Sequence, residues 1–130
     1  MRKKLYPRIS KQLSAVVANE DGVQLNVLAL DTSSAEICIQ CDIKQRNVMT
    51  PGGSYVRGGR PVELSISLEL PDENGQTSSI AARCHIAYSR RISKDLCKIG
   101  MRYIDMGKND YNRLILFIEK TLASKNGFAY

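Results

Sequence analysis

The stretch VELSISLEL, residues 62–70, decides the fold class of this chain, because apolar and polar residues alternate through it without a break. Successive side chains of a β-strand point to opposite faces, so the pattern predicts a half-buried strand and excludes a helix. Pro71 ends the alternation, and Asp72-Glu73-Asn74-Gly75 predicts a tight connection to a second strand.

The two-residue period continues on both sides of this stretch. The following strand is expected over residues 78–90, with one face formed by Ile80, Ala82, Cys84, Ile86 and Tyr88. Weaker strands are expected at 13–18, 23–30, 37–41 and 96–103. The first hundred residues therefore predict six short strands.

The period changes to that of a helix from Lys108 onward. One helical face carries the apolar side chains, namely Tyr111, Leu114, Ile115, Ile118 and Leu122. Asn109 or Gly107 is expected to cap the start, and Asn126-Gly127 to end the helix. The chain thus predicts a mainly β fold, a small antiparallel barrel with the helix covering an end or a side, because closure removes exposed sheet edges.

A chain of 130 residues fits one domain with a single core. We expect a flexible basic N-terminal segment at 1–12, a barrel domain with its helix at 13–125, and a short tail at 126–130. Within the domain, residues 44–60 are rich in glycine and show little apolar periodicity, so they are expected to form a long loop.

Positive charge is concentrated at the start of the chain. The cationic residues there are Arg2, Lys3, Lys4, Arg8 and Lys11, and no acidic residue occurs before Glu20. The whole chain has 19 Lys and Arg against 13 Asp and Glu, a formal charge of +6. This balance favours an anionic partner, and it leaves duplex DNA, RNA, an acidic membrane and a nucleotide all open.

Hydropathy and cysteine content indicate a cytoplasmic protein. No stretch has the apolar length needed to cross a bilayer, and the basic start lacks the apolar core of a secretory signal. The cysteines are too few for a disulfide scaffold, and in the cytosol they would stay reduced. They are Cys38, Cys41, Cys84 and Cys97.

Little in the sequence points to an enzyme, a metal or a cofactor. The single histidine, His85, follows Cys84 in a predicted strand; the two point to opposite faces, and His85 is expected to be exposed on the polar face. Cys38 and Cys41 have the spacing of a zinc half-site, but residues three apart in a strand also face opposite ways. A small hydrophobic role is the expected alternative for these cysteines.

Specific nucleic-acid binding is also not expected. Stacking surfaces need exposed aromatic residues among basic ones, and only Tyr6 and Tyr55 are expected to be available. The chain has no tryptophan, and Tyr88, Tyr103 and Tyr111 fall on predicted core faces. Neither a recognition helix nor an RNA-binding signature is present.

The order of four motifs resembles that of PilZ domains. Lys4–Ile9 resembles their R-x-x-x-R opening, and Leu30–Glu36 resembles their D/N-x-S-x-x-G turn. The similarity continues through Arg83–Arg91 and Ile99–Met106 and into the helix that follows. It covers nearly the whole chain apart from Lys44–Arg60.

The resemblance implies a six-stranded antiparallel barrel with a C-terminal α-helix, and cyclic di-GMP as ligand. It implies that Lys4 and Arg8 hold phosphates and guanine edges, while Asp31 and Ser33 meet a guanine. A guanidinium matches a phosphate or the O6/N7 edge of guanine, and a carboxylate accepts from the guanine N1–H and amino group. In the supporting roles, Arg2 and Lys3 are expected beside the phosphates and Arg90 at the rim of the site.

The chain departs from the family pattern at two positions. Lys4 replaces the first arginine and keeps the charge, but it loses the planar fork. Glu36 replaces the final glycine, which removes conformational freedom and adds a negative charge near the phosphates.

Two functions therefore stay open. The first is a cyclic di-GMP receptor whose terminus folds over the barrel and changes the surface shown to a downstream protein. The second is a degenerate PilZ domain that binds no nucleotide and acts as an adaptor, for example in pilus or flagellar machinery.

Overall fold

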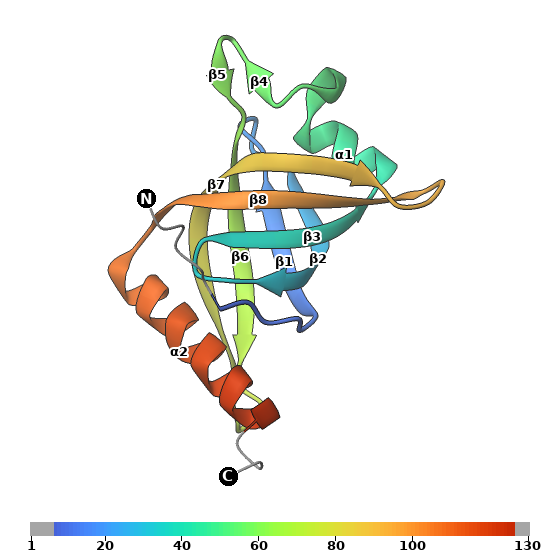
Figure 1. Cartoon of the computed structure of the whole chain (residues 1–130). Helices are drawn as coiled ribbons and strands as arrows, with labels where there is room; N and C mark the ends of the chain where they lie inside the picture. The colour runs from blue at the N-terminus through green and yellow to red at the C-terminus, as the bar shows by residue number, and fades with distance from the viewer. Residues whose placement is uncertain (1–6, 127–130) are drawn as a thin grey trace, which may run out of the picture.

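Within residues 7–126, which the computed structural model describes with side chains through residue 124, six antiparallel strands close into a barrel (Figure 1). The barrel strands are β1 (Leu13–Ala18), β2 (Gln24–Thr32), β3 (Glu36–Asp42), β6 (Glu63–Pro71), β7 (Thr77–Arg91) and β8 (Leu96–Met106). They follow one another around the barrel as β1-β2-β3-β8-β7-β6, and β1 pairs with β6 to complete the ring. The predicted fold class is confirmed, and every expected strand is present.

The barrel interior is filled by alternate residues of these strands. In β6, which covers residues 63–70 of the VELSISLEL stretch, Leu64, Ile66, Leu68 and Leu70 are all buried, while the residues between them face outward. Because the side-chain period of a strand is two, this register fixes which face of every neighbouring strand points to the core.

The segment at 44–60 is not the long loop that its glycine content predicts. It contains a helix, α1 (Ile43–Met49), a 3-10 turn, η1 (Pro51–Gly53), and a small hairpin of β4 (Val56–Arg57) and β5 (Arg60–Pro61). The helix begins at a capping box, in which the Asp42 carboxylate accepts from the Gln45 N–H at 2.7 Å and the Gln45 side chain accepts from the Asp42 N–H at 3.0 Å. Met49 at its end is fully buried.

Residues 7–12 are attached to the barrel. Ile9 is 1% exposed, and its backbone exchanges two hydrogen bonds with Thr32, at 2.9 and 3.0 Å. An apolar side chain thus anchors the described part of this segment in the core, while the flexibility expected for residues 1–12 stays a prediction.

The C-terminal helix, α2 (Lys108–Asn126), packs against one end of the barrel beside β7 (Figure 1). The Gly107 carbonyl accepts from the Tyr111 N–H at 2.8 Å, which places Gly107 at the N-cap. Leu114 and Ile118 are buried in the core, but Tyr111 is 42% exposed. The predicted apolar face was thus too wide at its first turn.

Asp110 ties the first turn of α2 to β7. Its carboxylate accepts from the Ala81 N–H at 3.0 Å and pairs with Arg113. The hydrogen bond from Ala81 and then the contact with Arg113 hold the pKa of Asp110 below its usual range. The charged carboxylate therefore contributes stability above the unfolded-state pKa, about 3.9, and this contribution is lost as the pH falls through the lower pKa of the folded state.

We expect Asp110→Asn to lower the free energy of unfolding by about 1 kcal/mol at neutral pH, because the charge-assisted contacts weaken. Urea denaturation followed by circular dichroism should show this difference shrinking once the pH is below about 4, where the wild-type carboxyl is protonated. Glu119→Gln, an exposed change on the same helix, serves as the control. A loss that stays constant across this pH range would contradict the assigned role of the charge.

Candidate functional site

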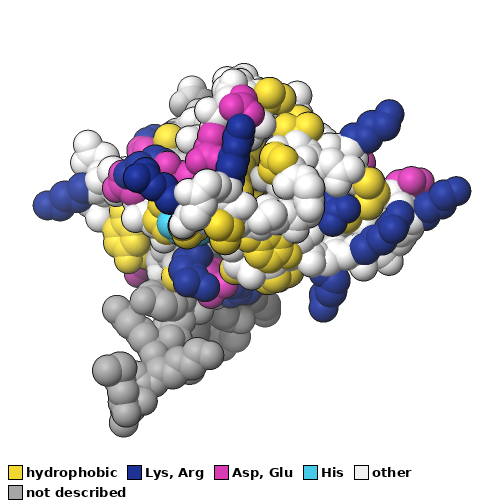
Figure 2. Space-filling view, turned by 90° about the horizontal axis from the view of Figure 1, so that it is seen from above, with side chains coloured by type: hydrophobic (Ala, Val, Ile, Leu, Met, Phe, Trp, Pro, Cys, Tyr) yellow, Lys and Arg dark blue, Asp and Glu magenta, His cyan; other side chains and the backbone are white. Residues whose placement is uncertain are grey.

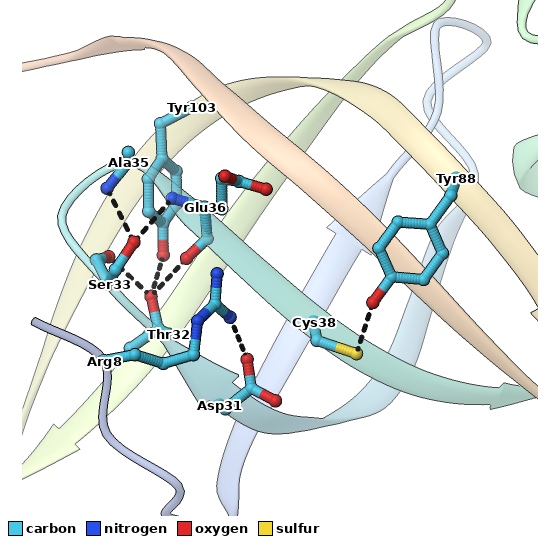
Figure 3. A network of polar contacts seen from close by, with 9 residues as sticks. All are labelled: Arg8, Asp31, Thr32, Ser33, Ala35, Glu36, Cys38, Tyr88 and Tyr103. Atoms are coloured by element: carbon cyan, nitrogen blue, oxygen red, sulfur yellow. Dashed lines mark hydrogen bonds and ion pairs between the residues drawn. The ribbon is translucent and has the colours of Figure 1, made fainter. Parts of the chain in front are cut away.

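Arg8 and Asp31 meet on the outside of the barrel although 23 residues separate them (Figure 3). The Arg8 Nη1 donates to Asp31 Oδ1 in an ion pair between partly exposed side chains. The bridge between Ile9 and Thr32 creates this contact, since it lays the N-terminal segment along the end of β2. The last arginine of one predicted motif thus lies against the aspartate of the other.

Ser33 holds the turn between β2 and β3. Its Oγ accepts from the N–H groups of Ala35 and Glu36, both at 3.1 Å, and the residue is 2% exposed (Figure 3). Such a hydroxyl cap satisfies backbone donors that the turn would otherwise leave unpaired. The structure therefore gives Ser33 a role in shaping the site, while its direct contact with a guanine stays a prediction.

Thr32 anchors the same turn to Tyr103 on β8. It is buried, and its Oγ1 lies 2.8 Å from the Tyr103 Oη, 2.9 Å from the Ser33 carbonyl oxygen and 3.1 Å from that of Glu36. Burial raises the pKa of Tyr103, so its phenol stays protonated. Sequence reasoning missed this network, because nothing in the local pattern marks a contact between residues 71 apart.

Glu36 adopts ordinary backbone geometry. None of the described non-glycine residues has a positive φ, so this turn does not need the left-handed conformation that only glycine adopts easily. At this position the glutamate therefore strains no backbone, and what it adds is its charge. Arg102 lies directly opposite Glu36 in the register of β3 and β8, where a cation can offset that charge.

Tyr88 lies on the outside of the barrel, so its predicted place in the core is wrong. The register of β7 and β8 shifts between Ile86 and Tyr88. Because of this bulge, the side chains that follow it face the opposite side of the sheet from the one the regular alternation predicts. The Tyr88 hydroxyl donates to Cys38 Sγ at 3.5 Å. This hydrogen bond, followed by partial burial, raises the pKa of Tyr88 to about 12, with Asp31 adding to the shift and Arg90 opposing it.

The remaining predicted site residues fall into two groups. Arg90 is exposed on β7, on the same face as Tyr88 two residues earlier. Lys4, Arg2 and Lys3 lie outside the described residues. The structure thus brings together Arg8, Asp31, Ser33 and Glu36 and places Arg90 on the adjoining outer face.

The cysteines and the histidine do not form a second site. Cys41 belongs to the barrel core, whereas Cys38 lies on the other face of β3 beneath Tyr88, so the two thiols cannot bind one ion together. Burial raises the pKa of Cys41 and Cys84 to about 12, which leaves both thiols protonated and unreactive. His85 is half-buried on the outer face rather than exposed as expected.

Positive charge is dispersed on the face of the described molecule that Figure 2 shows. Lys and Arg side chains project at several separate places, with acidic and hydrophobic side chains between them. Duplex-binding surfaces instead gather cations into a stripe or a single patch. This face gives no support to nucleic-acid binding.

Comparison with solved structures agrees with the barrel and its helix. The inhibitor of motility MotI/DgrA from Bacillus subtilis superposes with a TM-score of 0.70 at 17% identity over 96% of this chain and 54% of that chain. The PilZ domain of YcgR from Escherichia coli, solved with cyclic di-GMP, superposes with a TM-score of 0.58 at 11% identity over 97% and 98% of the two chains. The chain thus has the fold of a PilZ domain.

The similarity is one of structure rather than of sequence. This chain spans about half of the length of the MotI/DgrA chain. No protein-family model and no curated protein sequence matches it. Among the described residues, no helix is long and apolar enough to span a membrane.

Proposed function

We propose that this chain is a cyclic di-GMP receptor domain, a binding module of the bacterial cytoplasm rather than an enzyme. The observation that carries the proposal is the meeting of Arg8 and Asp31 on the outer surface of a PilZ-type barrel. A solved neighbour with this fold is a PilZ domain with cyclic di-GMP. The four buried free thiols are compatible with a reducing compartment.

The two side chains have complementary chemistry for a guanine nucleotide. The Arg8 guanidinium offers a planar fork of donors for a phosphate or for guanine O6 and N7. The Asp31 carboxylate accepts from the guanine N1–H and amino group. Lys4, with Arg2 and Lys3 nearby in sequence, supplies further charge for the phosphates. Ser33 keeps Asp31 in place through the turn that it caps.

Binding would change the position of the N-terminal segment. In the described structure Arg8 already neutralises Asp31, and the ligand has to take over both partners. Exchange of this internal ion pair for contacts with the nucleotide would move residues 7–12 and change the surface offered to a downstream protein. Because the structural neighbour MotI/DgrA is an inhibitor of motility, the motility machinery is a reasonable class of partner.

Isothermal titration calorimetry with cyclic di-GMP tests the proposal directly. Saturable binding is expected for cyclic di-GMP, and much weaker binding for cyclic di-AMP, which has the same phosphates but lacks the guanine donors that Asp31 would recognise. GMP, with one base and one phosphate, should also bind weakly. The proposal fails if concentrated protein gives no heat with cyclic di-GMP.

An adaptor that binds no nucleotide is the second candidate, and Lys4 and Glu36 favour it. The double variant Lys4→Arg with Glu36→Gly restores the family pattern at both positions. If this variant binds cyclic di-GMP and the natural protein does not, the natural protein is an adaptor.

Glu36→Gln should tighten cyclic di-GMP binding about tenfold, because it removes one negative charge near the phosphates. Since the backbone at Glu36 is ordinary, Glu36→Gly should gain no more than Glu36→Gln. Calorimetry at low and high salt would show the gain shrinking as salt screens the charge. Glu69→Gln, on the outer side of β6, is the matched control. Equal affinities of Glu36→Gln and wild type would show that the charge does not reach the ligand.

A further inference from the structure

Four directly paired residues form one row across the outer face of the barrel. Asp31 on β2 is paired with Cys38 on β3, Cys38 with Gly100 on β8, and Gly100 with Tyr88 on β7. Paired residues in adjacent strands point to the same side of a sheet. The row therefore leads from the carboxylate of the candidate site to an aromatic side chain (Figure 3).

Gly100 provides the space that the Tyr88 ring occupies. A Cβ atom added at Gly100 would lie 2.0 Å from Tyr88 Cε2 and within 2.6 Å of two further ring atoms, so the ring rests directly on the β8 backbone. The hydrogen bond from the Tyr88 hydroxyl to Cys38 Sγ, 3.5 Å long, fixes the direction in which the ring points. The ring is held on two sides by its own barrel.

This held ring is nevertheless open to solvent. Tyr88 is 42% exposed, which is unusual for an aromatic side chain with so fixed a position, since most gain their stability from burial. Asp31 belongs to the same row of paired residues, and Arg90 follows Tyr88 by two residues on the same exposed face of β7. An acceptor for guanine, a planar ring and a cation thus adjoin one another.

We propose that Tyr88 is the surface on which a guanine base of cyclic di-GMP stacks. Because Gly100 has no side chain, the ring can lie close against the β8 backbone. This inference rests on the proposed function and adds a residue to it. A base lying on the ring would have its edge toward Asp31 and its phosphate within reach of the Arg90 cation. Stacking on an aromatic side chain is favourable for any base, so Tyr88 would add affinity while Asp31 selects guanine.

The first test removes the ring. Tyr88→Leu should weaken cyclic di-GMP binding about tenfold or more in calorimetry, as alanine substitution does at other stacking sites. Tyr88→Phe keeps the ring and should bind within about threefold of wild type. Tyr111→Leu is the matched control, because Tyr111 is equally exposed but lies on α2.

The second test uses the fluorescence of a tryptophan at position 88 to report binding. The chain has no tryptophan, so Tyr88→Trp introduces a single tryptophan, whose emission can be excited selectively, at the proposed contact. Titration with cyclic di-GMP should quench its emission with the same saturation curve that calorimetry gives, while Tyr111→Trp should keep its emission unchanged. This readout does not depend on the stability of the leucine variant.

The outcomes separate the two proposals. If wild type binds and Arg8→Ala does not, but Tyr88→Leu binds like wild type and Tyr88→Trp is not quenched, the stacking role is overturned and the receptor function stands. If wild type shows no binding, both are overturned. Loss of binding in Tyr88→Leu together with quenching of Tyr88→Trp supports the assignment.

Discussion

Replacing Arg8 with alanine is expected to weaken cyclic di-GMP binding by about a hundredfold or more. The substitution removes a planar fork of donors, and charge-assisted hydrogen bonds contribute about 1.5–3 kcal/mol each. Loss of two such bonds corresponds to about a hundredfold or more in affinity. Calorimetry on wild type and variant under identical salt conditions measures the change.

Two further variants locate the origin of this effect. Arg8→Lys keeps the charge and loses the fork, so an intermediate affinity is expected. Arg57→Ala removes an exposed cation on the β4–β5 hairpin, where it pairs with Asp21 at 3.4 Å, and it should leave binding unchanged. A similar loss in Arg8→Ala and Arg57→Ala would mean that the ligand responds to overall charge rather than to a site.

Folding should be little affected by the loss of Arg8. Its ion pair with Asp31 joins partly exposed side chains, and such pairs contribute at most about 1 kcal/mol. Circular dichroism melts of the variant should therefore stay close to wild type. A large fall in melting temperature would show that Arg8 acts mainly on the fold.

Leu114→Ala is expected to cause the largest loss of stability, about 3 kcal/mol in the free energy of unfolding. Leu114 is fully buried where α2 packs on the barrel, and it belongs to the same core cluster as Ile118 and Ile9. Truncation of a buried leucine loses both its transfer free energy and the contacts around the cavity that remains. Urea denaturation followed by circular dichroism measures the change.

Leu116 on the same helix provides a matched control, since it is 51% exposed. The same substitution there should change the free energy of unfolding by less than about 0.5 kcal/mol. Equal losses at the two positions would indicate that alanine affects the helix itself and not its packing. A small loss at Leu114 would mean that α2 contributes little to the core.

The regular part of the fold could be predicted from the sequence because a single physical rule governs it. Alternation at 62–70 and its weaker copies locate all six barrel strands, and the change of period at Lys108 locates α2. The prediction failed where a local irregularity broke the rule. One extra residue at the β7 bulge turned Tyr88 outward, and a capping box at Asp42 started a short helix just before the glycine-rich part of the segment.

The candidate site was predictable only in part. The resemblance implied that Arg8 and Asp31 act together, and the structure shows the contact through the bridge at Ile9. The supporting contact of Thr32 with Tyr103 has no local signal, because it joins β2 to β8, two strands that come close only through their pairing with β3. The row from Asp31 to Tyr88 depends on strand register for the same reason.

The buried hydroxyl contact between Thr32 and Tyr103 also bears on the thermodynamics of ligand capture. This contact fixes the turn between β2 and β3 to β8 before any ligand arrives, so the turn has little conformational entropy left to lose. If the chain binds cyclic di-GMP as proposed, the entropic cost of association would then fall mainly on the nucleotide itself. A receptor of the proposed kind could then respond to a small ligand while most of its structure stays as it was.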